Sequence, residues 1–458
     1  MCMRELNLLE SIEEACGDLH PDARIYIAYS GGVDSQVLLH AATKWAQQQG
    51  IDATALHLNH GLSPNADDWQ AFCEVQCEAL GLPLLSRQVD IGKSSSSGLE
   101  QRAREARYTW FESLLEAGDV LLMAHHREDQ AETFMLRAMR GSGVRGLAAI
   151  PATRTLGKGR LKRPFLHHSK ADILTYATQQ GLNWIEDESN LSLKFDRNYI
   201  RHQIMPVLAK RWPQASRQLQ RSVQNCRDDQ QLLDELAEMD LASCQLQSKP
   251  LLMEVVPPLG LADFRAISFA RQRNLLHYLL RPLLGYPVGA EQMNEWLRQV
   301  NDAAPDAQSQ LKLESLSLML HHEQMHFSRF PETELVQVPL EWPTSSPLLV
   351  EQYAYEVRLM LQAEKPSSDV KTLAFEVGDT VCVHWRQGGE RVQLPGEDFS
   401  RALKKLFQDK RVAPWLRRVM PLISVDGLIV WSPLLGDFSP RLRDAKGRYY
   451  SFDLQVTG

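Results

Sequence analysis

An α/β fold class is predicted for this chain: an N-terminal parallel-sheet domain, a mainly helical middle domain and a small α+β C-terminal domain. The first half alternates short apolar runs with amphipathic helical patterns, as βαβ units around a parallel sheet do. A glycine-rich turn follows the first apolar run, and turn-separated β-like runs dominate after about residue 380. At 458 residues the chain is too long for one ordinary core and needs several domains.

Apolar runs and helical periodicity order the first half into strands and helices. The apolar runs predict strands at 24–29, 54–58, 84–89 and 120–124. The amphipathic patterns predict helices at 36–49, 67–80, 99–116 and 129–140. This alternation is typical of parallel strands joined by helical crossovers.

Changes in composition divide the chain into three predicted domains. From about residue 212 to 247 the chain is polar, charged and helix-forming, and Leu-rich helices then mix with shorter strand-like runs. A linker-like Pro-Ser-Ser break lies at 366–368, and one helix is predicted beyond it at 401–409. The β-like runs beyond this break lie at 381–385, 391–394, 422–425 and 428–431. We therefore expect domains at 1–216, 217–365 and 366–458.

Composition restricts the compartment and the chemistry. Hydrophobic residues make up 44% of the chain and charged residues 23%, which is a globular balance. No apolar run reaches about 18 residues, and acids stand where a secretory leader needs apolar residues, so we expect a cytoplasmic protein with no membrane partner. Seven scattered cysteines argue against a disulfide framework. Cys73 and Cys77 could hold a metal, but helix packing explains their spacing better.

Basic residues are concentrated despite a net charge of −7. The stretch 137–170 holds nine Lys or Arg and no acid, and the stretch 386–418 holds nine basic residues against four acids. Solvated loops and helix faces would explain one such stretch. Two stretches with interleaved aromatic residues favour a nucleic-acid partner.

A Ser-Gly-Gly-Val-Asp-Ser loop follows the first predicted strand and leads into a helix, which indicates a phosphate site. Backbone N–H groups and the helix dipole converge there, while glycines allow an anion to come close. An Asp beside a polyphosphate implies an intervening Mg²⁺. A serine-capped tight turn is the alternative. The predicted nucleotide-binding residues are Ser30, Gly31, Gly32, Val33, Asp34 and Ser35.

Two other nucleotide signatures are excluded. The chain has no GxxxxGK[ST] string. Residues 141–146 match the GxGxxG dinucleotide pattern but follow a predicted helix instead of a strand, so a flexible basic loop is the better interpretation.

A second polar cluster, 125–133, begins at the carboxyl end of the predicted strand 120–124. His125, Asp129 and Glu132 are suited to metal binding and proton transfer, and the two acids lie three apart on one helix face. An acidic first helical turn that only stabilises the helix is the alternative. The neighbouring phosphate loop favours the functional interpretation.

These strings together resemble the PP-loop ATP pyrophosphatases and, among them, the tRNA(Ile)-lysidine synthetase family. The resemblance is carried by SGGVDS, HLNHGL, LEQRAREARY, HHREDQAET, RGSGVRGL, WIEDESN, FDRNYIR and, at 386–417, RQGGERVQLPG…LKKLFQDKRVAPWLR. It implies an adenine nucleotide alpha hydrolase-like N-terminal domain and ATP as co-substrate. It also implies a ligase that joins free L-lysine to C2 of the wobble cytidine in tRNA(Ile) with a CAU anticodon. The tRNA is first adenylated with release of pyrophosphate, AMP leaves next, and the codon changes from AUG to AUA.

The resemblance also implies roles for individual residues. Catalysis or substrate binding falls to Asp34, Arg104, His125, Asp129 and Glu132. Asp34 and Asp129 are the candidate Mg²⁺ contacts, and Asp129 is the candidate acceptor of the lysine proton. Glu128 departs from the Asp usual at that family position, which puts a direct metal role for residue 128 in doubt.

Lys404, Lys405 and Arg411 are predicted to bind tRNA, with a charged outer helix face as the alternative. The oligomeric state stays open, and a homodimer is one option.

Two other functions stay in view. A PP-loop tRNA thiolase would also adenylate a base but needs a cysteine pair or an iron–sulfur cluster. A nucleotide-binding RNA chaperone would perform no chemistry. The sequence shows neither how lysine is selected nor how the methionine tRNA with the same anticodon is refused.

Overall fold

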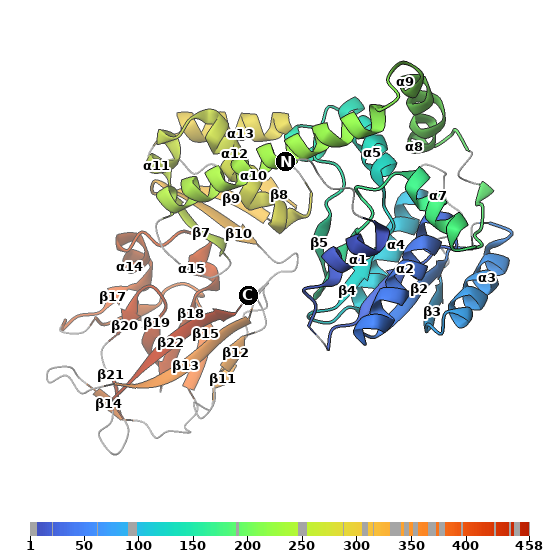
Figure 1. Ribbon diagram of the computed structural model, residues 1–458. Coiled ribbons are helices and arrows are strands. Elements are labelled where there is room, and N and C mark those ends of the chain that lie inside the picture. Colours follow the sequence, from blue (N-terminus) through green and yellow to red (C-terminus); the bar gives the residue numbers. More distant parts are fainter. Residues whose placement is uncertain are drawn as a thin grey trace. The chain divides into compact units, whose positions relative to one another are not determined.

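The chain divides into two compact units, Met1–Leu232 and Leu233–Gly458 (Figure 1). The computed structural model describes residues 7–20, 22–61, 63–89, 99–188, 192–245, 254–286, 288–304, 310–314, 316–329, 340–342, 348–350, 356–364, 372–374, 381–394, 397–425, 427–438, 441–443 and 449–457.

A six-stranded sheet with the order β3-β2-β1-β4-β6-β5 forms the centre of the first unit. Its strands are β1 (Ile25–Ala28), β2 (Ala53–Asn59), β3 (Leu84–Gln88), β4 (Val120–Leu122), β5 (Thr153–Leu156) and β6 (Gly159–Lys162). Neighbours pair in parallel except β5 and β6, which form an antiparallel hairpin. Because β2 and β4 lie on opposite sides of β1, the strand order reverses there, where open α/β sheets bind ligands at the carboxyl edge.

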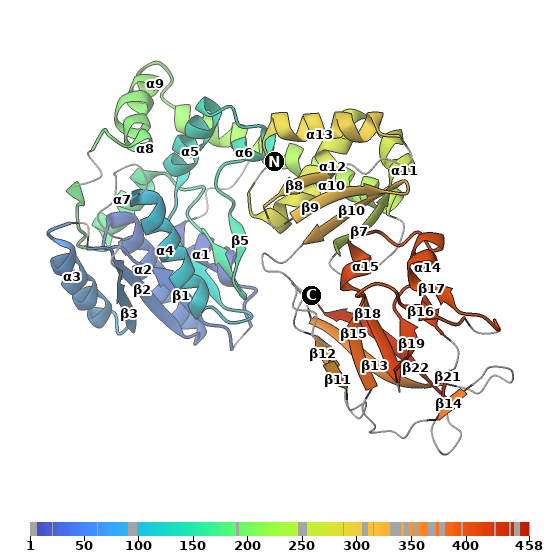
Figure 2. The same cartoon turned by 180° about the vertical axis from the view of Figure 1, so that it is seen from behind.

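Helices cover both faces of this sheet (Figures 1 and 2). Helices α1 (Leu8–Cys16), α2 (Val33–Gln49), α3 (Ala66–Ala79) and α7 (Lys170–Gln179) pack on one face, and α4 (Leu99–Leu114) packs on the other. The unit also contains α5 (Arg127–Met139), α6 (Val144–Leu147), α8 (Asp196–Tyr199), the π-helix η2 (Ile200–Ile204), α9 (Met205–Arg211) and the first part of α10 (Ala215–Cys244), which continues into the second unit. Ile25 and Ile27 of β1 pack into a core with α1, α2, α3 and α7, while Tyr26 packs with Trp110 and Phe111 of α4. Alternate side chains of β1 thus enter two cores, which explains its continuous apolar run.

The predicted first-half elements are confirmed to within a few residues, with one informative difference. The helix expected from residue 36 begins at Val33, inside the glycine-rich loop, because Gly32 is its N-cap. The Gly141–Gly146 segment follows helix α5 and not a strand, as predicted.

The second unit begins with helices packed on a four-stranded antiparallel sheet of order β7-β10-β9-β8. Its elements are β7 (Glu254–Gly260), α11 (Leu261–Ala266), α12 (Phe269–Leu284), α13 (Ala290–Asp302), β8 (Gln310–Leu313), β9 (Leu316–His321) and β10 (Gln324–Arg329). Phe264, Leu276, Trp296 and Phe327 are buried in the core between them.

Two five-stranded sheets, of order β11-β15-β18-β19-β20 and β12-β13-β22-β21-β14, a two-stranded sheet β16-β17 and two short helices complete the described part of the second unit. The elements are β11 (Leu340–Trp342), β12 (Leu348–Val350), β13 (Glu356–Glu364), β14 (Thr372–Ala374), β15 (Val381–Trp385), β16 (Arg391–Val392), β17 (Arg401–Ala402), α14 (Leu403–Asp409), α15 (Leu416–Val419), β18 (Pro421–Val425), β19 (Leu428–Ser432), β20 (Gly436–Asp437), β21 (Arg441–Arg443) and β22 (Tyr449–Thr457). β13 pairs along its whole length with β22. The linker predicted at 366–368 lies outside the described residues, and the three domain limits stay predictions.

The predicted fold class is therefore confirmed: a parallel-sheet first unit, helices in the middle region and an α+β C-terminal region. Within the described ranges, no helix is long and apolar enough to cross a membrane.

Candidate active site

The glycine-rich loop connects β1 to α2 at the carboxyl edge of the sheet. Gly32 caps α2 and provides no side-chain acceptor for the first-turn N–H groups. Those N–H groups have no partner within the helix and carry its positive dipole end. The loop therefore presents backbone donors to an anion.

Gly31 is required for both its conformation and its lack of a side chain. Its φ is +84°, and a Cβ there would lie 2.6 Å from Ile185 Cδ1 and 3.3 Å from Cys73 Sγ. The Gly31 carbonyl accepts a 2.9 Å hydrogen bond from the Ile185 amide. Segment 184–188 is thus held directly against the loop.

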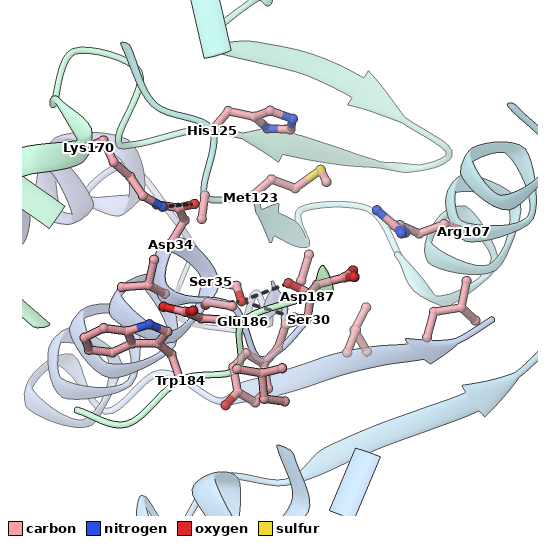
Figure 3. Close-up of a pocket in the computed structure, with 18 of the residues that line it drawn as sticks. Ser30, Asp34, Ser35, Arg107, Met123, His125, Lys170, Trp184, Glu186 and Asp187 are labelled. Atoms are coloured by element: carbon pink, nitrogen blue, oxygen red, sulfur yellow. Dashed lines mark hydrogen bonds and ion pairs between the residues drawn. The ribbon is translucent and has the colours of Figure 1, made fainter. Parts of the chain in front are cut away.

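The loop serines stabilise the turn. The Ser35 hydroxyl donates to the Gly32 carbonyl at 2.9 Å and accepts from the Ser30 amide at 3.2 Å. The two hydroxyl oxygens lie 3.1 Å apart (Figure 3). The serine-capped turn is therefore present, and its hydrogen bonds leave the N-terminus of α2 open to an anion.

A cavity of about 930 Å³ lies over this loop (Figure 3). Its polar lining includes Ser30, Asp34, Arg107, His125 and Lys170, and its other walls come from strand ends and segment 184–188. The volume is at the upper end of the range for small-molecule sites.

Asp34 points into the cavity and is paired with a cation. Its two carboxylate oxygens lie 2.6 and 2.7 Å from Lys170 Nζ (Figure 3). His126 Nε2 lies 3.8 Å from the same carboxylate and 3.5 Å from that of Asp129. The His126 ring therefore lies between the two acids.

Asp129 and Glu132 are buried at the start of α5 and clamped by two arginines. Arg197 donates to Asp129 at 2.6 Å and to Glu132 at 3.1 Å. Arg201 donates to both oxygens of Glu132, at 2.7 and 2.8 Å. Arg201 lies in the π-helix η2, a distortion that often marks functional sites. The expected helix stabilisation is also present, because Asp129 accepts from the His126 amide at 2.9 Å.

Burial and charge pairing shift the pKa values of these groups in opposite directions. Burial alone would raise the pKa of Asp129, but His126 and Arg197 lower it to about 2. Burial lowers the pKa of His125 to about 3, so its imidazole is neutral at neutral pH. Burial opposes a charge on His126, yet Glu128, Asp129 and Asp34 raise its pKa above the ordinary value.

The structure brings together most of the predicted site residues. Asp34 and His125 line the cavity, and Asp129 and Glu132 contact the cavity-lining Arg201. Arg104 is exposed and lies against Tyr108, outside the lining, whereas Arg107 one turn later lines it.

The described residues contain no group of three or more His, Cys, Asp or Glu able to hold a metal. Asp34 and Asp129 nevertheless both approach His126 Nε2, so their carboxylates lie near each other. Mg²⁺ is commonly held by one or two carboxylates with substrate phosphates. The donor set fits such an ion. Glu128, whose metal role was in doubt, instead accepts from the Lys170 amide at 2.9 Å.

The sequence analysis did not single out several of the cavity-lining residues, among them Arg107, Lys170, Trp184 and Arg201. Arg107, Trp184 and Arg201 lie in strings quoted above for the family resemblance, so the strings contained the signal. Lys170 follows the N-cap Ser169 of α7, and the sequence offers no local reason to pair it with Asp34.

Comparison with known families assigns three regions of the chain. A PP-loop domain model matches residues 4–208. Models described as the TilS substrate binding domain and the TilS substrate C-terminal domain match residues 259–326 and 381–437.

Curated relatives match over nearly the whole chain. A protein of Coxiella burnetii named tRNA(Ile)-lysidine synthase is 35% identical over 96% of this chain and 94% of its own. One of Pseudomonas fluorescens with the same name is 39% identical over 87% and 86%. Among solved structures, the U34-tRNA thiolase NcsA of Methanococcus maripaludis has a TM-score of 0.39 at 18% identity, over 48% of this chain and 77% of that one.

Proposed function

The chain belongs to the tRNA(Ile)-lysidine synthase family of ATP-dependent ligases, and we propose that it forms lysidine through an adenylated tRNA intermediate. The single observation that carries this proposal is the cavity over the Ser30–Ser35 loop, which brings the open N-terminus of α2 together with Asp34, His125 and Lys170.

In the proposed first step, the loop holds the phosphates of ATP. The C2 oxygen of the wobble cytidine attacks the α-phosphorus, the bond to the β-phosphate oxygen breaks, and pyrophosphate leaves. The open N-terminus of α2 and the Lys170 ammonium stabilise negative charge on the phosphates. This step converts a poor leaving oxygen into AMP.

In the proposed second step, the side-chain amine of lysine attacks C2 and expels AMP. Carboxylates at Glu186, Asp187 and Glu188 line the cavity and supply the negative charge that suits the ammonium groups of lysine. Asp129 stays the proposed proton acceptor. His126 and Arg197 lower its pKa to about 2, so the carboxylate is ionised at neutral pH and free of the proton that it would accept.

We propose that Mg²⁺ is held by Asp34 and Asp129. When bound, it would neutralise phosphate charge in the first step. The Lys170 ammonium already occupies the Asp34 carboxylate, so the ion and this lysine compete for the same acid.

The test is product analysis of an unmodified CAU-anticodon tRNA(Ile) transcript incubated with ATP, Mg²⁺ and lysine. We expect a mass gain equal to lysine minus water on the wobble cytidine, with one pyrophosphate and one AMP released per modification. Pyrophosphate release without lysine incorporation, or sulfur incorporation in its place, would contradict the proposal.

A further inference from the structure

Three arginines from different segments surround Tyr108 of α4. Arg104, one turn earlier, and Arg154 of β5 place their Cζ atoms 4.9 and 4.6 Å from the ring centroid. The Arg163 guanidinium, which follows β6, also interacts with the Tyr108 hydroxyl. We call these four residues the Tyr108 cluster.

The cluster concentrates positive charge on neutral partners. Among the described residues, its guanidinium groups contact the phenol ring, the His125 imidazole and the Pro151 carbonyl. The contrast with Arg197 is informative, because that arginine is paired with two carboxylates in the same unit. Like charges gathered at one place oppose folding unless an anion offsets them.

The excess of positive charge is most unfavourable at Arg163, because this residue is only 5% exposed and water can stabilise its charge little. It donates to His125 Nδ1 at 3.2 Å and to the Pro151 carbonyl at 2.7 Å, and both acceptors are neutral. Burial lowers the pKa of Arg163 to about 10, so it keeps its charge at neutral pH. A buried cation with neutral partners is stabilised when an anion binds beside it.

The cluster borders the active cavity without lining it. The Tyr108 hydroxyl approaches Met123 Sδ at 3.6 Å, and both Met123 and His125 are cavity-lining residues (Figure 3). The arginines of the cluster lie outside the lining itself, and Arg104 is exposed. An anion bound here would lie next to the cavity-lining Met123 and His125 and outside the Ser30–Ser35 loop.

We propose that the Tyr108 cluster binds a backbone phosphate of the substrate tRNA next to the wobble nucleotide. This inference rests on the proposed function. A guanidinium group can donate two parallel hydrogen bonds to the oxygens of one phosphate. The Tyr108 ring holds the guanidinium groups of Arg104 and Arg154 in place for that contact. The β5–β6 hairpin that carries Arg154 is thereby assigned to tRNA positioning.

The test compares Arg154→Gln with Arg160→Gln in the full chain. Arg160 is an exposed arginine of the same hairpin outside the cluster, so the pair loses the same charge at different places. Binding of the CAU-anticodon tRNA(Ile) transcript is measured by fluorescence anisotropy between about 50 and 200 mM salt. We expect Arg154→Gln to weaken tRNA binding about fivefold to tenfold and to reduce the salt slope by about 1. Arg160→Gln should change the affinity less than about twofold.

Two further variants test the role of the ring. Tyr108→Phe keeps the aromatic ring that contacts Arg104 and Arg154, so this variant should bind tRNA as the wild type does. Tyr108→Leu removes the ring and should lose as much tRNA affinity as Arg154→Gln. ATP affinity and the circular dichroism spectrum are measured for every variant. We expect both to match the wild type, which would show that the fold is intact.

Three results would overturn the inference. Equal losses of tRNA affinity in Arg154→Gln and Arg160→Gln would mean that the tRNA is attracted by the overall positive charge of the hairpin and not by the Tyr108 cluster. Loss of ATP affinity with intact tRNA binding would mean that the cluster holds the phosphates of ATP. Wild-type tRNA binding in both Arg154→Gln and Tyr108→Leu, in a preparation that makes lysidine, would exclude the site while leaving the proposed function standing.

Discussion

At the scale of single residues, Gly31 combines two constraints that can be separated by experiment. Gly31→Ala adds a Cβ to a backbone with φ +84° and places it 2.6 Å from Ile185 Cδ1. We expect the substitution to displace segment 184–188, to weaken ATP binding at least tenfold and to cost about 1–3 kcal/mol of folding stability. Isothermal titration with ATP and thermal unfolding measure the two effects.

Gly50→Ala is the matched control for this prediction. Gly50 has φ +68°, but a Cβ added there would meet nothing within 4 Å, so the substitution introduces backbone strain without the clash. It should cost about 1 kcal/mol and leave ATP binding unchanged. Wild-type ATP affinity in Gly31→Ala would show that the cradle does not depend on this close approach.

Asp129 makes a pH-dependent contribution to stability, and its sign follows from its lowered pKa. The folded value of about 2 lies below the ordinary 3.8, so the stabilisation is complete above pH 4 and is lost as the pH falls towards 2. The gap in unfolding free energy between wild type and Asp129→Asn should therefore narrow by about 2 kcal/mol over that interval. Urea unfolding followed by tryptophan fluorescence measures the gap at each pH.

The exposed carboxylate Asp22 gives the control variant for this measurement. Asp22→Asn removes a carboxylate at the surface and should change the unfolding free energy at neutral pH by less than about 0.5 kcal/mol. If the difference in unfolding free energy between wild type and Asp129→Asn widens towards pH 2, the pKa of Asp129 is not lowered in the folded protein and the prediction is wrong.

At the scale of elements, helix α3 packs both of its cysteines into the core of the first unit, and Cys73 lies against Gly31 of the glycine-rich loop. Cys73 and Cys77 are almost completely buried, and burial raises the pKa of each thiol to about 12. A protonated, buried thiol is neither a nucleophile nor a metal ligand. We expect Cys73→Ala with Cys77→Ala to keep lysidine formation within about threefold while costing about 1–2 kcal/mol of stability.

Mass spectrometry of the tRNA product and chemical unfolding test this prediction, with the exposed Cys382→Ala as control. Loss of product in the double variant at unchanged fold would favour sulfur chemistry over lysine transfer.

Elements were easier to predict from the sequence than the contacts between them. Strand β1 and the glycine-rich turn follow from local patterns, because a run buried on both faces and a turn with positive φ each leave a local signature. The contacts of Arg197 and Arg201 with the two buried acids leave no such local signature in the sequence. Arg197 reaches Asp129 from 68 residues away, and Lys170 reaches Asp34 from 136 residues away, so only the folded sheet edge brings them together.

At the scale of the whole molecule, the acidic net charge conceals basic residues in both compact units. Arg154 lies in the first unit, whereas Lys404, Lys405 and Arg411 are exposed in the second. Lys404 and Lys405 lie on α14, whose buried residues are Leu403, Leu406 and Phe407. The packing of this helix thus leaves its charged face to solvent, as the charged-face alternative requires, so only tRNA binding can separate the two interpretations.

Changing Lys404, Lys405 and Arg411 together to Ala should weaken tRNA binding and lower its salt slope by about 2–3, since each lost phosphate contact removes about one counterion release. When Arg154→Gln is added to this triple variant, the loss of tRNA affinity should be multiplied by the factor measured for Arg154→Gln alone. The two sets of residues lie in different units, so their effects on tRNA binding should be independent. Lys44→Ala, an exposed lysine on α2, controls for net charge. An unchanged salt slope in the triple variant would leave α14 as a solvated face. A combined loss no larger than the greater single loss would mean that the tRNA contacts only one of the two regions at a time.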